Sequence, residues 1–146
     1  MFEQANNAKP LLKLIEANAK AGHDTMGGLK GGVDLLGKIV QLPAIEIAQL
    51  SSDTISNAAG AFAHWNGTAY YLAGAQLPGQ PDEGAMYRLL WEAILNAQRK
   101  GCTIFDFEGS MIPGVARFFR QFGSTPVPYF SLTKNRLPLP LRWMHA

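Results

Sequence analysis

A strand, a long amphipathic helix and a second strand fill residues 68–108, and this unit constrains the fold more than any other feature. Apolar residues recur at helical spacing in its middle: Met86, Leu89, Leu90, Ala93, Ile94 and Ala97. Gly101 follows and is well suited to end the helix. A strand–helix–strand connection of this length joins parallel strands with a right-handed crossover. The chain must therefore contain a sheet with at least one parallel strand pair.

Further strands and helices are predicted on both sides of this unit. Asn66-Gly67 separates predicted strands at 56–65 and 68–75, and this dipeptide is the strongest short hairpin signal. Another strand is predicted over 44–50, and two amphipathic segments within 9–40 predict helices. The predicted order is two helices, three strands, the long helix, a strand, a helix and a last strand near 126–133.

The strand at 102–108 is read as a buried strand that ends on two carboxylates, Asp106 and Glu108. A parallel strand covered on both faces is an apolar run, and ligands of open α/β sheets bind at the carboxyl ends of strands. An unpaired buried carboxylate is costly. The two acids are therefore expected to have a partner or a function. Pro113 then fits the first turn of a helix over 113–122, which carries a phenylalanine-rich face.

Three segments carry a family resemblance: FDFEGSMIPGVARFFRQFG, YYLAGAQ and AMYRLLWEAILNAQRKG. They resemble the C-terminal signature of GNAT-fold acyltransferases of the FemA/FemB-like group, which includes enzymes that build peptidoglycan interpeptide bridges. The resemblance covers residues 44–133 well and 9–40 loosely. It implies an α/β (α+β) fold with a mixed sheet, in which an antiparallel three-stranded meander precedes a parallel βαβ crossover and helices cover both faces.

The resemblance also implies how the chain is organised. One GNAT-like domain is expected over 1–146, with helices in 9–40, the sheet with its helices in 44–133 and a tail at 134–146. The GNAT fold has one further strand in front, and nothing in residues 1–9 looks like it. FemA/FemB-like proteins often contain two such domains, and this chain resembles the second alone. We therefore expect a homodimer or pairing with a second GNAT half, through the apolar region 126–146.

Composition excludes several classes of protein. The 146 residues are 47% hydrophobic and 16% charged, which is typical of a globular domain. No apolar run approaches the roughly 20 residues that a membrane helix needs. The N-terminus shows no secretory signal pattern, and Cys102 is the only cysteine, so a cytoplasmic location is expected. That cysteine and the three scattered histidines form no metal-ligand spacing, and no metal is expected.

The net charge of +2 is too small to imply a polyanionic partner, but its distribution is one-sided. No acidic residue follows Glu108. The basic residues beyond it are Arg117, Arg120, Lys134, Arg136 and Arg142. Such a tail attracts phosphate or nucleic acid, and it is equally consistent with a solvated surface.

In GNAT enzymes the acyl-CoA pyrophosphate lies on a glycine-containing loop at the start of the long helix, where backbone N–H groups and the helix dipole attract anions. The corresponding segment here is QLPGQPDEGAMYR. The residues it implies as cofactor-binding are Gln76, Gly79, Gly84, Tyr87 and Arg88. Pro81 and Asp82 fit the family pattern poorly, because proline lacks an N–H and a carboxylate repels a pyrophosphate. Ordinary helix capping by Asp82 is the alternative.

Residues near the strand ends are the candidates for chemistry. Glu108, at a strand exit, is proposed as the base that takes a proton from a substrate amine. Tyr71 and Ser110 are further catalytic candidates, since each offers a hydroxyl group. Asp106 and Gly109 are candidates for substrate binding, and a structural role for Asp106 is the alternative.

By analogy with the family, the chain is expected to be an N-acyltransferase or aminoacyltransferase. A small-molecule or peptide amine is the expected acceptor. The donor is acyl-CoA, an acyl carrier protein or an aminoacyl-tRNA. The alternative is a non-catalytic GNAT-like half-domain that serves as an interaction or scaffold module.

Overall fold

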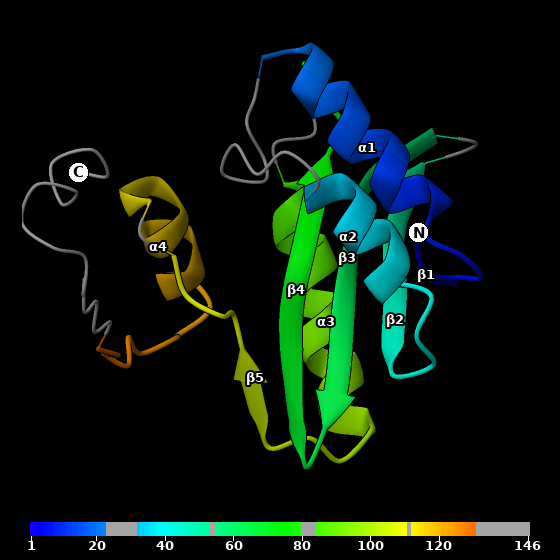
Figure 1. Ribbon diagram of the computed structural model, residues 1–146. Coiled ribbons are helices and arrows are strands. Elements are labelled where there is room, and N and C mark those ends of the chain that lie inside the picture. Colours follow the sequence, from blue (N-terminus) through cyan, green and yellow to red (C-terminus); the bar gives the residue numbers. More distant parts are fainter. Residues whose placement is uncertain (23–31, 53–54, 80–83, 111, 131–146) are drawn as a thin grey trace, which may run out of the picture.

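The computed structural model describes residues 1–22, 32–52, 55–79, 84–110 and 112–130 (Figure 1). Its elements in chain order are β1 (Phe2–Ala5), α1 (Lys9–Lys20), α2 (Gly32–Ile39), β2 (Ile45–Ser52), β3 (Ile55–Trp65), β4 (Thr68–Gln76), α3 (Ala85–Arg99), β5 (Ile104–Asp106) and α4 (Pro113–Arg120). The described order agrees with the prediction except at the two ends of the chain.

The five strands form one sheet in the order β1-β2-β3-β4-β5. The first four pair antiparallel, and β4 pairs parallel with β5. Asn66 and Gly67 both have positive φ, 48° and 76°, as the predicted hairpin turn requires. The mixed sheet with a meander and a parallel crossover is therefore confirmed.

The prediction that no strand precedes the first helix was wrong. Phe2 to Ala5 form β1, which pairs with β2 from Phe2↔Leu50 to Ala5↔Ile47. The segment FEQA has little local hydrophobic signal, because a short edge strand needs to bury only part of one face. Phe2 packs against the core, and the main chain of β2 supplies the rest of the pairing.

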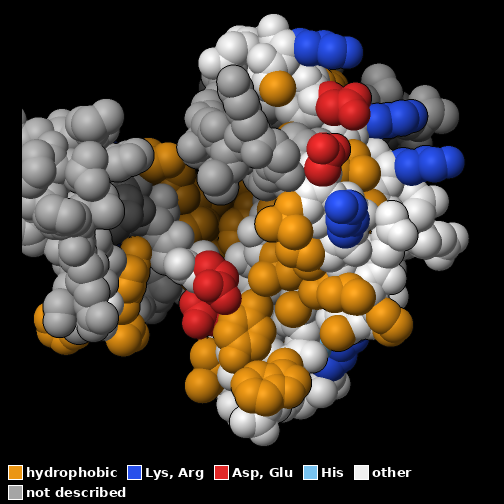
Figure 2. All heavy atoms as spheres, in the orientation of Figure 1, with side chains coloured by type: hydrophobic (Ala, Val, Ile, Leu, Met, Phe, Trp, Pro, Cys, Tyr) orange, Lys and Arg blue, Asp and Glu red, His pale blue; other side chains and the backbone are white. Residues whose placement is uncertain are grey.

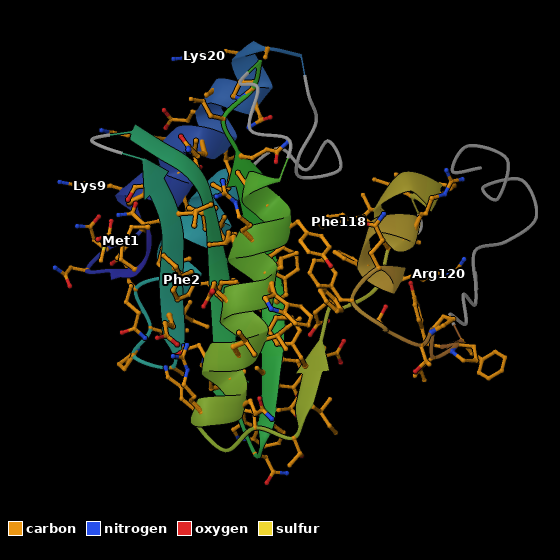
Figure 3. All side chains as sticks on the ribbon, turned by 180° about the vertical axis from the view of Figure 1, so that it is seen from behind. Met1, Phe2, Lys9, Lys20, Phe118 and Arg120 are labelled. Carbon is orange, nitrogen blue, oxygen red and sulfur yellow. The ribbon has the colours of Figure 1, made fainter. Side chains whose placement is uncertain are left out.

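Helices cover both faces of the sheet, as the fold predicted (Figures 1 and 3). On one face α1 and α2 bury leucines and isoleucines against alternate strand residues: Leu11, Leu14, Ile15, Leu36, Ile47, Ala59, Ala61 and Ala75. On the other face α3 and α4 do the same: Ala48, Phe62, Leu89, Leu90, Ala93, Phe107 and Phe119. The small alanines in the strands allow both helix layers to pack closely on the sheet.

One buried polar residue connects α1 to the end of β4. Asn18 of α1 donates from Nδ2 to the carbonyl of Leu14 (2.8 Å) and to the carbonyl of Gln76 (2.7 Å). Because Gln76 is the last residue of β4, this contact fixes the point at which the chain leaves the sheet toward α3.

Two predicted strands differ from the structure. The strand predicted over 102–108 spans only Ile104–Asp106, and Ile104 is 59% exposed. This strand lies at the edge of the sheet and is covered on the α3 side, so it is not a strand buried on both faces. The strand predicted near 126–133 is absent from the described residues 126–130, where Pro126 and Pro128 lack the N–H that a ladder needs; residues 131–133 lie outside the described ranges. None of the described helices is long and apolar enough to cross a membrane.

Candidate functional site

The parallel pair β4–β5 is short, and the two strands separate beyond it. They pair only at Thr68↔Ile104, Ala69↔Phe105 and Tyr70↔Asp106. Figures 1 and 3 show the chain turning away from β4 after β5 and continuing into α4. The second half of β4 therefore has no partner on the β5 side among the described strands. In Figure 2 the surface is hollowed between β4 and the chain beyond β5, with hydrophobic side chains inside the hollow and acidic ones at its edge, and this hollow is called the opening below.

The turn at 106–110 is shaped by its backbone and by its own side chains. Glu108 has φ 58° and Gly109 has φ 72°. Asp106 Oδ1 accepts a hydrogen bond from the Glu108 N–H (2.8 Å), and Ser110 Oγ accepts one from the Ile112 N–H (3.1 Å). A glutamate in the left-handed region is strained, and such strain is often found at functional sites.

Both carboxylates of this turn are exposed, and the strand that they follow is not the buried strand that the sequence predicted. Asp106 has the structural role that was the alternative to substrate binding, since its side chain accepts a hydrogen bond from the main chain within the turn. Ser110 is likewise engaged, at the start of α4. In the described part of the chain, the Glu108 carboxylate has no hydrogen-bond partner. It is the acid of this turn that is available to a ligand.

Aromatic rings fill the α3 side of the opening. The Tyr71 ring lies 5.7 Å from Phe62, 6.4 Å from Phe107 and 6.0 Å from Phe119, between ring centroids. Phe107 also stacks on Phe119, at 4.6 Å. Of the two adjacent tyrosines, Tyr71 is therefore the one that faces the core. Burial raises the pKa of Tyr71 above its ordinary value, so its hydroxyl stays protonated at neutral pH and can donate a hydrogen bond but cannot act as a base.

Two glycines that face each other determine where the Tyr71 hydroxyl lies. Gly60 of β3 pairs with Gly74 of β4. A Cβ atom on Gly74 would lie 2.3 Å from the Tyr71 hydroxyl, and one on Gly60 would lie 3.0 Å from the Phe62 ring. The missing side chains let both rings lie over the strands, and the Tyr71 hydroxyl reaches along β4 toward its carboxyl end. Glycine inside a strand signals such a close approach, and this signal was present in the sequence.

The N-terminus of α3 lies next to this aromatic cluster. Gly84 occupies the N-cap, no side chain caps the helix and no acidic residue lies in its first turn. The prediction of Asp82 as N-cap was wrong, because the helix begins after Gly84. Tyr87 is 39% exposed and stacks on Phe122 of α4 at 4.7 Å. Backbone N–H groups of the first turn are thus left for a ligand, as at an anion site.

The residues predicted to bind the cofactor lie at or beyond the carboxyl end of β4. Gln76 ends β4, Gly79 (φ 70°) follows it, and Gly84 and Arg88 belong to the start of α3. The stacked pair Tyr87–Phe122 joins that helix start to α4, which follows the 106–110 turn.

Several residues weighed from the sequence cannot be placed. They are His23, Pro81, Asp82, Glu83, Lys134, Arg136, Arg142 and His145, which lie outside the described ranges. Arg117 and Arg120 are exposed on α4. Within the ranges that are described, no group of His, Cys, Asp and Glu side chains could hold a metal ion.

No family model and no curated protein matches the sequence, but solved structures match the fold. The aminoglycoside N-acetyltransferase AAC(6')-Iy, in complex with a CoA-containing bisubstrate analog, aligns with a TM-score of 0.63 and 14% identity over 94% of this chain and 98% of that one. A ribosomal-protein-alanine N-acetyltransferase from Brucella melitensis gives 0.66 and 10%, over 92% and 99%. A GNAT family acetyltransferase from Staphylococcus aureus gives 0.61 and 15%, over 92% and 98%. The chain therefore has the GNAT fold.

Proposed function

We propose that the chain is an N-acyltransferase that moves an acyl group from acyl-CoA to an amine. The observation that carries the proposal is the opening between β4 and the 106–110 turn, with the exposed Glu108 carboxylate beside it and the uncapped start of α3 beyond the carboxyl end of β4. Several solved structures with this fold support it, since they are described as acetyltransferases and two of them hold CoA or a CoA analog.

The donor's pyrophosphate would bind at the start of α3. Free backbone N–H groups follow Gly84, the helix dipole favours an anion there, and Arg88 on the first turns adds a positive charge. Gln76 and Gly79 lead into this loop, and the partly exposed Tyr87 ring offers an apolar wall for the rest of the donor. The thioester end of the donor then extends along β4 into the opening.

The reaction requires a proton acceptor for the amine and a donor for the leaving sulfur. The Glu108 carboxylate takes a proton from the attacking amine nitrogen. The nitrogen bonds to the acyl carbon, the carbon–sulfur bond breaks, and the electron pair leaves with the sulfur. Tyr71, which remains protonated, can donate its hydroxyl to the developing negative charge. Asp106, Gly109 and Ser110 act through the turn: Asp106 accepts a hydrogen bond from the Glu108 N–H, Gly109 supplies a positive φ, and Ser110 accepts from the Ile112 N–H.

A narrower version of the proposal concerns the donor and acceptor. The resemblance of residues 105–123 to FemA/FemB-like enzymes and the one-sided basic charge support an aminoacyl-tRNA donor and a peptide amine. Pairing with a second GNAT half has lost its main argument, because β1 supplies the first strand. We therefore place acyl-CoA first and keep aminoacyl-tRNA as a separate arm of the test.

One observation favours the second candidate, a non-catalytic interaction module. The rings of Tyr71, Phe107 and Phe119 contact one another on the α3 side of the opening and take up space there that a ligand would need. Under this alternative the fold is retained and the donor site is lost.

A thermal-shift panel with CoA, acetyl-CoA and tRNA separates the candidates. A ligand at about 100 times its dissociation constant adds roughly 2.7 kcal/mol to the unfolding free energy. Stabilisation by CoA and acetyl-CoA, followed by release of free thiol in the presence of a panel of small and peptide amines, is the expected result. Stabilisation by tRNA alone would favour the narrower version, and no shift with any of the three would leave the interaction module as the function.

A further inference from the structure

A second cluster of reactive side chains lies at the opposite end of the sheet from Glu108. His64 Nε2 lies 2.9 Å from Glu46 Oε2, and Cys102 Sγ lies 3.7 Å from His64 Nδ1. The residues come from the start of β2, the end of β3 and the segment before β5. A thiol, an imidazole and a carboxylate in this order have the arrangement of a nucleophile, its base and the group that orients the base.

The contacts determine which ring nitrogen of His64 carries the proton. A carboxylate only accepts hydrogen bonds, so His64 Nε2 must donate its hydrogen to Glu46. In the neutral ring Nδ1 then holds a lone pair, which faces the Cys102 thiol. The thiol can donate to this nitrogen and can pass its proton to it.

The state of Glu46 argues against a purely structural network. Lys100 Nζ forms an ion pair with the same oxygen, Oε2, that His64 contacts. The other oxygen, Oε1, is buried and has no hydrogen-bond partner among the described residues. A buried carboxylate oxygen without a partner calls for an explanation, and a role in chemistry is one. The carboxylate is held toward His64 although its own hydrogen bonding is left incomplete.

We propose that Cys102, His64 and Glu46 accept an acyl group from a thioester, so that the chain acylates itself on Cys102. His64 Nδ1 takes the thiol proton while Sγ bonds to the acyl carbon. The bond from that carbon to the donor's sulfur breaks, the electron pair leaves with this sulfur, and His64 returns the proton to it. The products are an acyl-Cys102 thioester and a free donor thiol, with nothing oxidised or reduced. Acyl-CoA as the natural thioester rests on the proposed function.

The acylated cysteine is a separate site and not an intermediate of transfer to the amine. The strand β5 (Ile104–Asp106) lies between the two residues, so Cys102 precedes the amino end of this strand and Glu108 lies beyond its carboxyl end. Cys102 is partly exposed, so a thioester can reach it from solvent. An open pocket of about 540 Å³ is lined in part by Glu46, His64 and Lys100, and Cys102 is not among its lining residues.

The test follows acetylation of the whole chain by intact-protein mass spectrometry and peptide mapping, with acetyl-CoA in one arm and phenyl thioacetate in the other. We expect a single acetyl group on Cys102, removed by hydroxylamine, absent in Cys102→Ser and formed about 100-fold more slowly in His64→Gln. Glu46→Gln should slow it by a smaller factor. Glu16→Gln, which replaces an exposed acid on α1, is the matched control and should react like the parent.

Partial unfolding of a variant cannot imitate this result, because it exposes the thiol and accelerates its acylation. Equal rates in His64→Gln and the parent would overturn the proposal, as would acetyl groups found only on amines and resistant to hydroxylamine. Phenyl thioacetate carries no nucleotide and needs no donor site. Rapid, His64-dependent acylation by it therefore supports the cysteine site even where the chain fails to bind acyl-CoA.

Discussion

The two ends of the sheet place a glutamate in opposite surroundings. At the lower end Glu46 is held by His64 and Lys100, its side chain 15% exposed. At the upper end Glu108 is exposed and unpartnered in the described part of the chain, on a backbone with positive φ. Where the strands remain paired, side chains from neighbouring segments hold one oxygen of the Glu46 carboxylate. Where they separate, main chain and side chains are left for a ligand.

The largest expected effect concerns Phe119, which anchors α4 beside the opening. Phe119 is 8% exposed and stacks on Phe107 beside the opening. Phe119→Ala should lower the unfolding free energy by about 3–5 kcal/mol, the range for truncating a buried aromatic side chain. Urea denaturation measures it, with the less buried Phe118→Ala as control. A loss below about 1 kcal/mol would show that α4 is not anchored to the sheet by this stripe.

The second prediction tests whether the exposed glutamate is the working one. Glu108→Gln should reduce acyl transfer about 100-fold or more at neutral pH, since it removes only a proton acceptor. The thermal midpoint should stay close to that of the parent, because the carboxylate has no partner to lose. Glu16→Gln serves as the matched control. A variant that turns over at the parent rate would remove Glu108 from the mechanism.

The third prediction concerns the tie between α1 and the end of β4. Asn18→Ala leaves the Gln76 carbonyl without its donor and should cost about 1–3 kcal/mol of unfolding free energy. Because that carbonyl lies just before the segment that leads to the proposed pyrophosphate site at the start of α3, the apparent affinity for CoA should fall as well. Calorimetric titration with CoA checks this. Unchanged affinity alongside lower stability would mean that the tie serves the fold alone.

The smallest effect is a pH dependence. Burial raises the pKa of Tyr71 in the folded chain above its unfolded value of about 10. The folded chain therefore binds the proton more tightly, and the resulting stability is complete below pH 10 and is lost as pH rises through the folded pKa. Above pH 10 the parent should lose more stability than Tyr71→Phe, measured by urea denaturation. Parallel curves would show that the phenol is not buried in solution.

The sequence predicted the middle of the fold well and its ends poorly. Strong periodicity marked α3, and Asn66-Gly67 marked the hairpin, because both signals are local. Residues 2–5 carry little such signal, and only pairing with β2 makes them a strand. The strand predicted near 126–133 is absent from its described part, where Pro126 and Pro128 lack the N–H groups that a ladder needs.

The sequence supplied candidate residues for the site but not their geometry. The strand that ends on Asp106 and Glu108 was predicted to be buried, yet both carboxylates are exposed, because β5 is the edge strand of the sheet. The Glu46–His64–Cys102 cluster was missed, since its members are far apart in sequence and only the antiparallel register of β2 and β3 brings two of them together. Contacts between distant strands leave no local pattern to read.

The close approach of Tyr71 to Gly74 makes the residue that is tolerated at position 74 depend on the residue at position 71. With a phenol over the strand, any side chain at 74 collides with it, so a mutation there is harmful in this background. Once position 71 is small, the space is released and position 74 is free to vary. The two positions should therefore change together among descendants of this chain. Loss of the tyrosine must come first, and this order restricts the routes by which the lining of the opening can be altered.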